Sequence, residues 1–366
     1  MNLVGIVQAL LVNISLIAGI NDPQLKVTPV GFLKMLLENN ATTNIKNLAD
    51  LQSGQDRQIK VRYMQRGAES EVSDVDDCET PITAEWKETT LEHTLFSKIG
   101  IFISDEEMRK YEAEATATLS AGTPSAPMMR GLYETLVTKI NGLIQKIDSN
   151  LVSAQASKFG GNAAYANGTD GNPTAAQSIK LGKTAELTDG YIKLITDSQE
   201  NEVSDNLLVC GNGLINAFDA YNRLKTGTDM NGIGALGFQT YNDPKTASLW
   251  GANHFGVFAK GSVGFVGDYN KNVGAYAGMK GGSYFFTLPV PVQLANGELS
   301  ALTFDCQLKY EDCPIFNGAG KKIADRGWKL IVSKTYGLFN LPTDAYASTD
   351  RLAGVNGSFH YVATAQ

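Results

Sequence analysis

The sequence predicts an α+β protein in which a β-rich excursion, one very long helix and a glycine-rich mixed region follow one another. The helix is indicated by six apolar side chains at three- and four-residue spacings, the period of one helix face: Leu132, Leu136, Ile140, Leu143, Ile147 and Leu151. Before it, Gln58–Met64 alternates like a strand. After Lys225 the residues Gly, Tyr and Asn become frequent, which favours turns and short strands.

The first 55 residues are expected to form an N-terminal arm with a short helix at Pro29–Asn39. Its apolar stretch Leu3–Ile20 lacks the preceding Lys or Arg of a secretory signal. Three polar residues interrupt the stretch, which argues against a membrane span: Gln8, Asn13 and Ser15. The segment is therefore expected to pack on protein, and no membrane contact is predicted.

Residues 56–104 are expected to form an extended, hairpin-like excursion. Beside Gln58–Met64, the strand-like pieces are Thr83–Thr90 and Thr94–Ile103. Polar residues fill much of the excursion, so it has little to bury alone and is expected to rest on something outside its own domain. An acidic run lies within it: Glu71, Asp74, Asp76, Asp77 and Glu79. The run could hold a hard cation such as calcium, but it lacks the glycine and spacing of an EF-hand loop. A solvated tip is therefore expected, with a cation site as the lesser alternative, and no metal ligand is assigned.

The long helix is expected from Pro127 to about Phe159, because Pro is tolerated in a first turn and Gly160-Gly161 ends the pattern. At 1.5 Å per residue it would be about 45–50 Å long. A short helix at Asp105–Glu112, with its acids in the first turn, precedes it. A rod of this length suits a plate-like building block better than an ordinary compact domain.

The rest of the chain alternates between helices and strands. Helices are expected at Thr188–Ser198 and Leu214–Leu224. A last short β segment is expected within residues 343–366. The remaining strands are expected at these positions: Asn206–Cys210, Gly237–Asn242, His254–Phe265, Ser283–Leu294, Leu299–Tyr310 and Trp328–Leu338.

Two glycine motifs invite a nucleotide-binding interpretation. Gly232–Gly237 matches GxGxxG, but a polar loop precedes it and Phe238 does not begin a helix. Gly211–Gly213 has the better context, strand to turn to helix, yet it lacks a third glycine and the lysine of a P-loop. The preferred interpretation of Gly232–Gly237 is a coincidental match, and that of Gly211–Gly213 is a tight turn between a strand and a helix. With no other catalytic signature, the sequence predicts no enzyme, no catalytic residue and no cofactor.

Net charge and cysteine content further narrow the functions that this protein could have. The net charge of −7 argues against a dedicated nucleic-acid binder, although not against a wall that encloses nucleic acid. The four cysteines form no CxxC pair, and the histidines are scattered, so zinc is not predicted and free thiols are expected. A Cys306–Cys313 disulfide is the lesser alternative. The residues concerned are Cys78, Cys210, Cys306 and Cys313, with His93, His254 and His360.

The order of these parts resembles that of tailed-phage major capsid proteins, the Hong Kong 97-type fold. Phe32–Asp50 resembles the N-terminal arm, Gln58–Ile103 the extended loop and Pro127–Phe159 the spine helix. Asn206–Lys225 resembles the start of the axial domain, His254–Phe265 a strand of alternating small and large apolar residues, and Trp328–Gly337 the late strand that returns to the peripheral domain. The resemblance implies an arm (1–55), an extended loop (56–104), a peripheral domain with the spine helix (105–205), an axial domain (206–327), and a return strand with the C-terminal segment (328–366).

By this resemblance the chain would self-assemble, as hexamers and pentamers, into an icosahedral shell around a double-stranded DNA phage genome, without sequence-specific contact. It would be a virion protein assembled in the host cytoplasm, with scaffolding, portal and decoration proteins as candidate partners. Two alternatives stay open: an encapsulin-type compartment with the same fold, and a nucleotide-dependent α/β enzyme that uses one of the glycine motifs.

Overall fold

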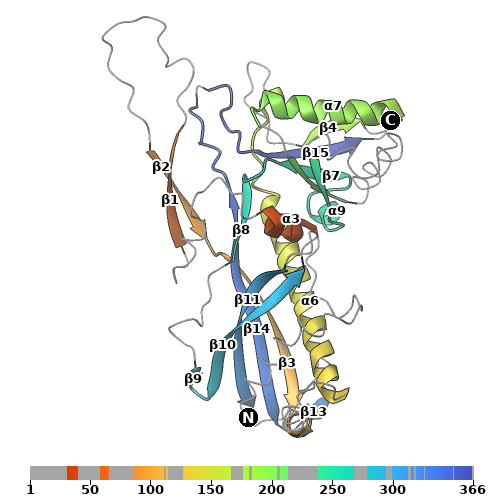
Figure 1. Ribbon diagram of the computed structural model, residues 1–366, viewed down its shortest axis with the longest axis vertical. Helices are drawn as coiled ribbons and strands as arrows, with labels where there is room; N and C mark the ends of the chain where they lie inside the picture. Colours follow the sequence, from red (N-terminus) through yellow and green to blue (C-terminus); the bar gives the residue numbers. More distant parts are fainter. Residues whose placement is uncertain are drawn as a thin grey trace, which may run out of the picture.

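The structure is a computed structural model that describes most of the chain between Gly31 and Thr364. The described residues are 31–39, 58–65, 86–110, 113, 127–165, 176–180, 184–203, 207–212, 238–267, 278–293, 299–311, 315–316, 319–324, 326–348 and 350–364. They form an elongated body with two lobes, each built on its own sheet, and a hairpin to one side (Figure 1).

The lower lobe in Figure 1 is a sheet with the spine helix α6 (Pro127–Gln155) lying along it. The helix has 29 residues, which makes it about 43 Å long. The strands follow the order β3-β14-β11-β10-β9, and each neighbouring pair is antiparallel. Their bounds are β3 Leu95–Ser104, β9 Gly278–Lys280, β10 Ser283–Gln293, β11 Leu299–Glu311 and β14 Gly327–Asn340.

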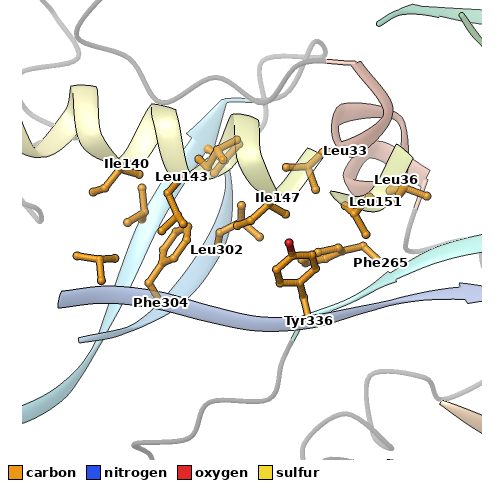
Figure 2. Close-up of a cluster of buried hydrophobic side chains, with 14 of the residues drawn as sticks. Leu33, Leu36, Ile140, Leu143, Ile147, Leu151, Phe265, Leu302, Phe304 and Tyr336 are labelled. Carbon is orange, nitrogen blue, oxygen red and sulfur yellow. The ribbon is translucent and has the colours of Figure 1, made fainter. Parts of the chain in front are cut away.

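The expected stripe of α6 faces this sheet. Ile140, Leu143 and Ile147 are almost completely buried, and Figure 2 shows them over Leu302 and Phe304 of β11. Leu136 and Leu151 are equally buried, while the side chain of Leu132 lies outside the described residues. The helix ends at Gln155 rather than at Phe159, because the chain turns there: the N–H of Lys158 donates to the carbonyl of Gln155 at 2.9 Å.

A polar contact fixes the helix on the sheet. The side-chain amide of Asn150 on α6 donates to the Tyr336 hydroxyl of β14 at 2.8 Å, and Ser97 of β3 lies 2.9 Å from the same hydroxyl. A buried polar group costs free energy unless it is paired, so these bonds favour one register of helix on sheet.

The upper lobe is a five-stranded mixed sheet in the order β4-β15-β7-β5-β6. The interior strand β5, between β7 and β6, is buried at every position, as expected for a strand covered on both faces. The bounds are β4 Gln177–Lys180, β5 Leu207–Gly211, β6 Phe238–Asn242, β7 His254–Phe258 and β15 Ser358–Thr364. Helix α7 (Thr184–Glu200) runs beside β4, and η4 (Ala163–Tyr165) and α9 (Thr246–Leu249) are single turns.

The single strand expected over His254–Phe265 is wrong. The chain turns between Phe258 and Val263, where Gly261 has a φ of +87° and the N–H of Ser262 donates to Ala259 O. The first half is β7 in the upper sheet. The second half is β8 (Val263–Val266), which pairs with the end of β14 in an antiparallel register. Lys260-Gly261-Ser262 interrupts the apolar run with residues typical of a turn, but the sequence does not show that the two halves join different sheets.

Most other expected elements are confirmed within a few residues. The strands of the excursion, the pair β10–β11, β14, α7 and the C-terminal β15 all occur where the pattern placed them. Residues 105–110 are helical, and α3 (Gly31–Asn39) matches the expected arm helix. Four short strands were not expected: β4, β9, β12 (Ile315–Phe316) and β13 (Lys322–Ala324). The expected helix Leu214–Leu224 and the stretch Leu3–Ile20 lie outside the described residues.

Strands that pair in one sheet come from different ranges of the expected domain division. Strand β3 leaves the excursion to pair with β14, and β10 and β11 lie under α6 rather than in the upper lobe. Strand β15 joins the upper sheet between β4 and β7. Among the described helices, none is long and apolar enough to cross a membrane.

Candidate assembly surface

A two-stranded hairpin projects beside the two lobes (Figure 1). It pairs β1 (Gln58–Met64) with β2 (Trp86–Glu92) in antiparallel register, from Gln58 opposite Glu92 to Met64 opposite Trp86. No further strand of the described chain joins this sheet. An isolated two-stranded hairpin is only marginally stable in water, so this one needs support from other groups.

The support comes partly from a loop of the same chain. The Tyr63 hydroxyl donates to Asp344 Oδ1 at 2.5 Å, and the Gln65 amide donates to the carbonyls of Asp344 and Tyr346 at 2.9 and 3.1 Å. Burial, and then the bond to the Asp344 carboxylate, raise the pKa of Tyr63 well above its usual value. The hydroxyl therefore stays protonated and acts as the donor. This face of the hairpin is held by its own subunit.

The base of the hairpin is fixed by apolar packing. Leu91 on β2 is buried with Val266 of β8 and Phe339 of β14. Gly337 passes so close to the carbonyl of Glu92 that a Cβ at this position would overlap the backbone. The hairpin therefore leaves the body at a defined place, and its direction is set by packed groups rather than by a free linker.

The other face of the hairpin has no cover within the described chain. Trp86 is 62% exposed and Met64, directly opposite, is 55% exposed. Toward the base, Lys60 and Glu88 on the same face form a solvent-exposed ion pair at 3.9 Å. Such a pair contributes little to stability. A tryptophan beside a methionine in water, with charged residues around it, is the pattern typical of a protein–protein contact.

A cavity of about 420 Å³ lies at the base of the hairpin, between β2, the end of α6 and the end of β14. Threonine side chains from the hairpin and Lys158 line it. The Lys158 ammonium donates to the carbonyl of Leu338 at 2.9 Å, and burial lowers the pKa of this amine despite the nearby Glu92. Hydroxyls, amides and one engaged ammonium provide hydrogen bonds, but the lining residues include no Cys, His or second carboxylate for acid–base or nucleophilic chemistry.

The motifs weighed for nucleotide or metal binding gain no support. Gly232–Gly237, the acidic run 71–79 and Gly213 lie outside the described residues. Gly211 ends β5, and its carbonyl accepts the N–H of Asp243 at 2.6 Å. The carboxylate of Asp243 and the start of α3 lie at this edge of the sheet. A carboxylate repels phosphate, so this edge is poorly suited to a nucleotide. In the described part of the chain, no three His, Cys, Asp or Glu side chains gather as metal ligands.

The structure brings together two histidines that are far apart in the sequence. His254 Nδ1 lies 2.9 Å from His360 Nε2, and His360 stacks on Phe159 with ring centroids 4.3 Å apart. Burial, and then His254, lower the pKa of His360 to about 4, so this ring is neutral near pH 7. The pairing of β7 with β15 creates the contact, and nothing in the sequence signals it.

The two described cysteines are free thiols, as expected. Cys210 and Cys306 are completely buried, and burial raises the pKa of both. Buried thiols of this kind are unreactive. Cys78 and Cys313 lie outside the described residues.

Comparison with known proteins gives similarity in structure alone. No protein-family model matches the chain. No curated protein matches it in sequence.

Solved phage structures are similar to the chain over nearly its whole length. One is the capsid asymmetric unit of cyanophage A-1(L), with a TM-score of 0.48, 11% identity, and coverage of 91% of this chain and 93% of that chain. A structure from Mycobacterium phage Bobi has a TM-score of 0.43, 15% identity and coverage of 96% and 98%. The capsid structure of cyanophage P-SCSP1u has a TM-score of 0.40, 14% identity and coverage of 93% and 90%.

Proposed function

We propose that this chain is the major capsid protein of a tailed phage, which assembles with copies of itself into an icosahedral shell around double-stranded DNA. In this proposal it is a structural protein with no catalytic residue and no cofactor. Its shell would consist of hexamers and pentamers assembled in the host cytoplasm, and the virion would be its final location. Scaffolding, portal and decoration proteins are the candidate partners.

The observation that carries this proposal is the hairpin. It projects from a body whose two sheets are already packed in buried cores, it is fixed at its base, and the face that the described chain leaves uncovered presents Trp86 and Met64. Such a face gains stability only when another molecule covers it. In a closed assembly of identical subunits, that molecule is a second copy of the chain, and repetition of the same contact builds a ring or shell.

The test is the oligomeric state of the expressed full-length chain. We expect size-exclusion chromatography with light scattering to show capsomers or shells, and negative-stain microscopy to show closed particles. A monomer that persists at high concentration and in the presence of a co-expressed scaffolding protein would contradict the proposal.

The encapsulin-type alternative shares the fold and differs in content. Shells that co-purify with double-stranded DNA, or that fill with it when a portal and packaging motor are supplied, support the phage capsid. Shells that instead retain one cargo enzyme in stoichiometric amounts support the compartment. The net charge of −7 fits a wall that encloses DNA without binding it tightly.

The acidic run between the two hairpin strands offers a second test. We expect replacement of residues 71–79 by a short turn to leave folding unchanged and to lower shell yield. If the five carboxylates meet basic residues on a neighbouring copy, salt should weaken this contact, so the parent's shell yield should itself fall at high salt. Circular dichroism would measure folding, and gradient sedimentation would measure shell yield, each at about 50 mM and about 500 mM NaCl. Equal shell yields for parent and variant at both salt concentrations would show that the run makes no contact between subunits.

A further inference from the structure

The short helix α3 connects the two lobes. In Figure 1 it lies at the junction between α6 and the upper sheet. Phe32, Leu33, Met35 and Leu36 are essentially unexposed, and the Phe32 ring packs against Trp250 and Phe258 at centroid distances of 5.9 and 5.5 Å. At its C-terminal end, the Tyr241 hydroxyl of β6 donates to Glu38 at 2.8 Å. The helix therefore contacts the spine helix and the upper sheet at once.

The first turn of α3 is held by one carboxylate from each lobe. The N–H of Leu33 donates to Asp148 Oδ1 of α6 at 2.8 Å, and the N–H of Phe32 donates to Asp243 Oδ2, just after β6, at 3.1 Å. Free N–H groups at a helix start favour negative charge. Gly31 has a φ of +63°, and a Cβ there would overlap the side chain of Asp243. The junction is thus built closely around these two carboxyl groups.

Asp148 is the group in this junction whose charge is in question. It is completely buried, and the charged groups facing it are Lys245 Nζ at 2.5 Å and the carboxylate of Asp243. The thiol of Cys210 on β5 is also near, and burial keeps it protonated. Burial, and then Asp243, raise the pKa of Asp148, while Lys245 and the Leu33 N–H lower it. The effects of burial and Asp243 are larger, so the pKa of Asp148 is raised to about 6. Undocking of α3 would admit water to Asp148 and remove part of the burial that raises its pKa, and it would also remove the Leu33 N–H, while Asp243 and Lys245, which are not on α3, would remain beside it.

We propose that α3 is a proton-linked clamp between the spine helix and the upper sheet, which holds the two lobes more firmly at mildly acidic pH than at neutral pH. A group whose pKa rises when α3 docks takes up protons on docking at pH values between its two pKa values. Its contribution to docking is fully present below its ordinary pKa and is lost as pH rises through about 6. Protonation of Asp148 relieves its repulsion with Asp243 while the protonated carboxyl can still accept the Leu33 N–H. This inference does not depend on shell formation.

Hydrogen–deuterium exchange of the full-length chain tests the clamp directly. Exchange of peptides from residues 31–39, corrected for the intrinsic effect of pH, reports the opening of α3. We expect protection to rise between pH 7.5 and pH 5 by up to about tenfold, the limit reached if Asp148 regains its ordinary pKa on undocking, while peptides from β11 stay constant. Parallel changes in α3 and β11, constant protection of α3, or weaker protection of α3 in acid would each overturn the proposal.

Two variants separate Asp148 from other titrating groups. Asp148→Asn keeps an acceptor for the Leu33 N–H and removes the titration, so α3 should show equal protection at both pH values. The matched control is Glu106→Gln, an exposed carboxylate on the helical segment 105–110, which should keep the parental pH dependence. Persistence of the pH dependence in Asp148→Asn would assign it to another group. If Asp148→Asn fails to fold, the parent's own pH series still decides whether the clamp exists.

Discussion

Ile140→Asp is expected to abolish folding of the subunit. Ile140 is completely unexposed and lies in the middle of the α6 stripe, against the sheet (Figure 2). An unpaired carboxylate buried there costs on the order of 5 kcal/mol, which is comparable to the whole free energy of unfolding of a typical domain, about 5–15 kcal/mol. Protonation of the new Asp would reduce the cost but would leave a polar group and a poorly filled space. Soluble yield and thermal melts would measure the effect.

The matched control is the neighbouring residue. Lys139 is exposed on the polar side of α6, so Lys139→Ala should change the free energy of unfolding by no more than about 0.5 kcal/mol. A soluble Ile140→Asp variant with the parental Tm would mean that α6 does not pack on the sheet through this stripe, and the capsid proposal would lose the spine helix on which it partly depends.

Trp86→Asp is expected to leave the subunit folded and to reduce shell yield at least tenfold. The side chain is mostly exposed, so the lone subunit loses little when it is replaced. A tryptophan at the centre of an interface commonly contributes about 2–4 kcal/mol, and tenfold in affinity corresponds to about 1.4 kcal/mol. Because the same contact recurs at every subunit of a shell, its loss is multiplied. Sedimentation of assembled particles and the Tm of the unassembled protein would be compared.

Conservative and distant variants complete this experiment. Trp86→Phe keeps an apolar ring and should restore most of the shell yield. Ile192→Asp removes an equally exposed apolar side chain from α7, far from the hairpin in Figure 1, and tests whether any new surface charge has the same effect. Parental shell yield for Trp86→Asp would show that the outer face of the hairpin is not covered in the assembly.

The elements with a strong local period were determined by the sequence itself. The α6 stripe, the alternation of Gln58–Met64 and the long strands β10, β11 and β14 each repeat one pattern over several turns or pleats. Period depends only on where successive side chains point, so it is visible without any knowledge of partners. The glycines after Lys158 likewise marked the end of the spine helix to within four residues.

The candidate surface was only half visible in the sequence. The alternating strands and polar content of residues 56–104 indicated an excursion with little to bury alone, and the resemblance added a role between subunits. That Trp86 lies opposite Met64, and that Tyr63 and Gln65 bind the loop at Asp344, depends on pairing register and on contacts across about 280 residues. Local propensity does not contain that information.

Tertiary structure alone decided which strands became neighbours. His254–Phe265 divides between the two sheets at Gly261, and the turn residues Lys260–Ser262 mark a break without showing which strand each half joins. Likewise Asp148 and Asp243 are ordinary acidic residues until α3 buries them and uses both as acceptors. The sequence pattern shows which face of each segment must be buried. Long-range packing determines which other segment buries it, and the same packing sets the strand register, the burial and the pKa of the groups involved.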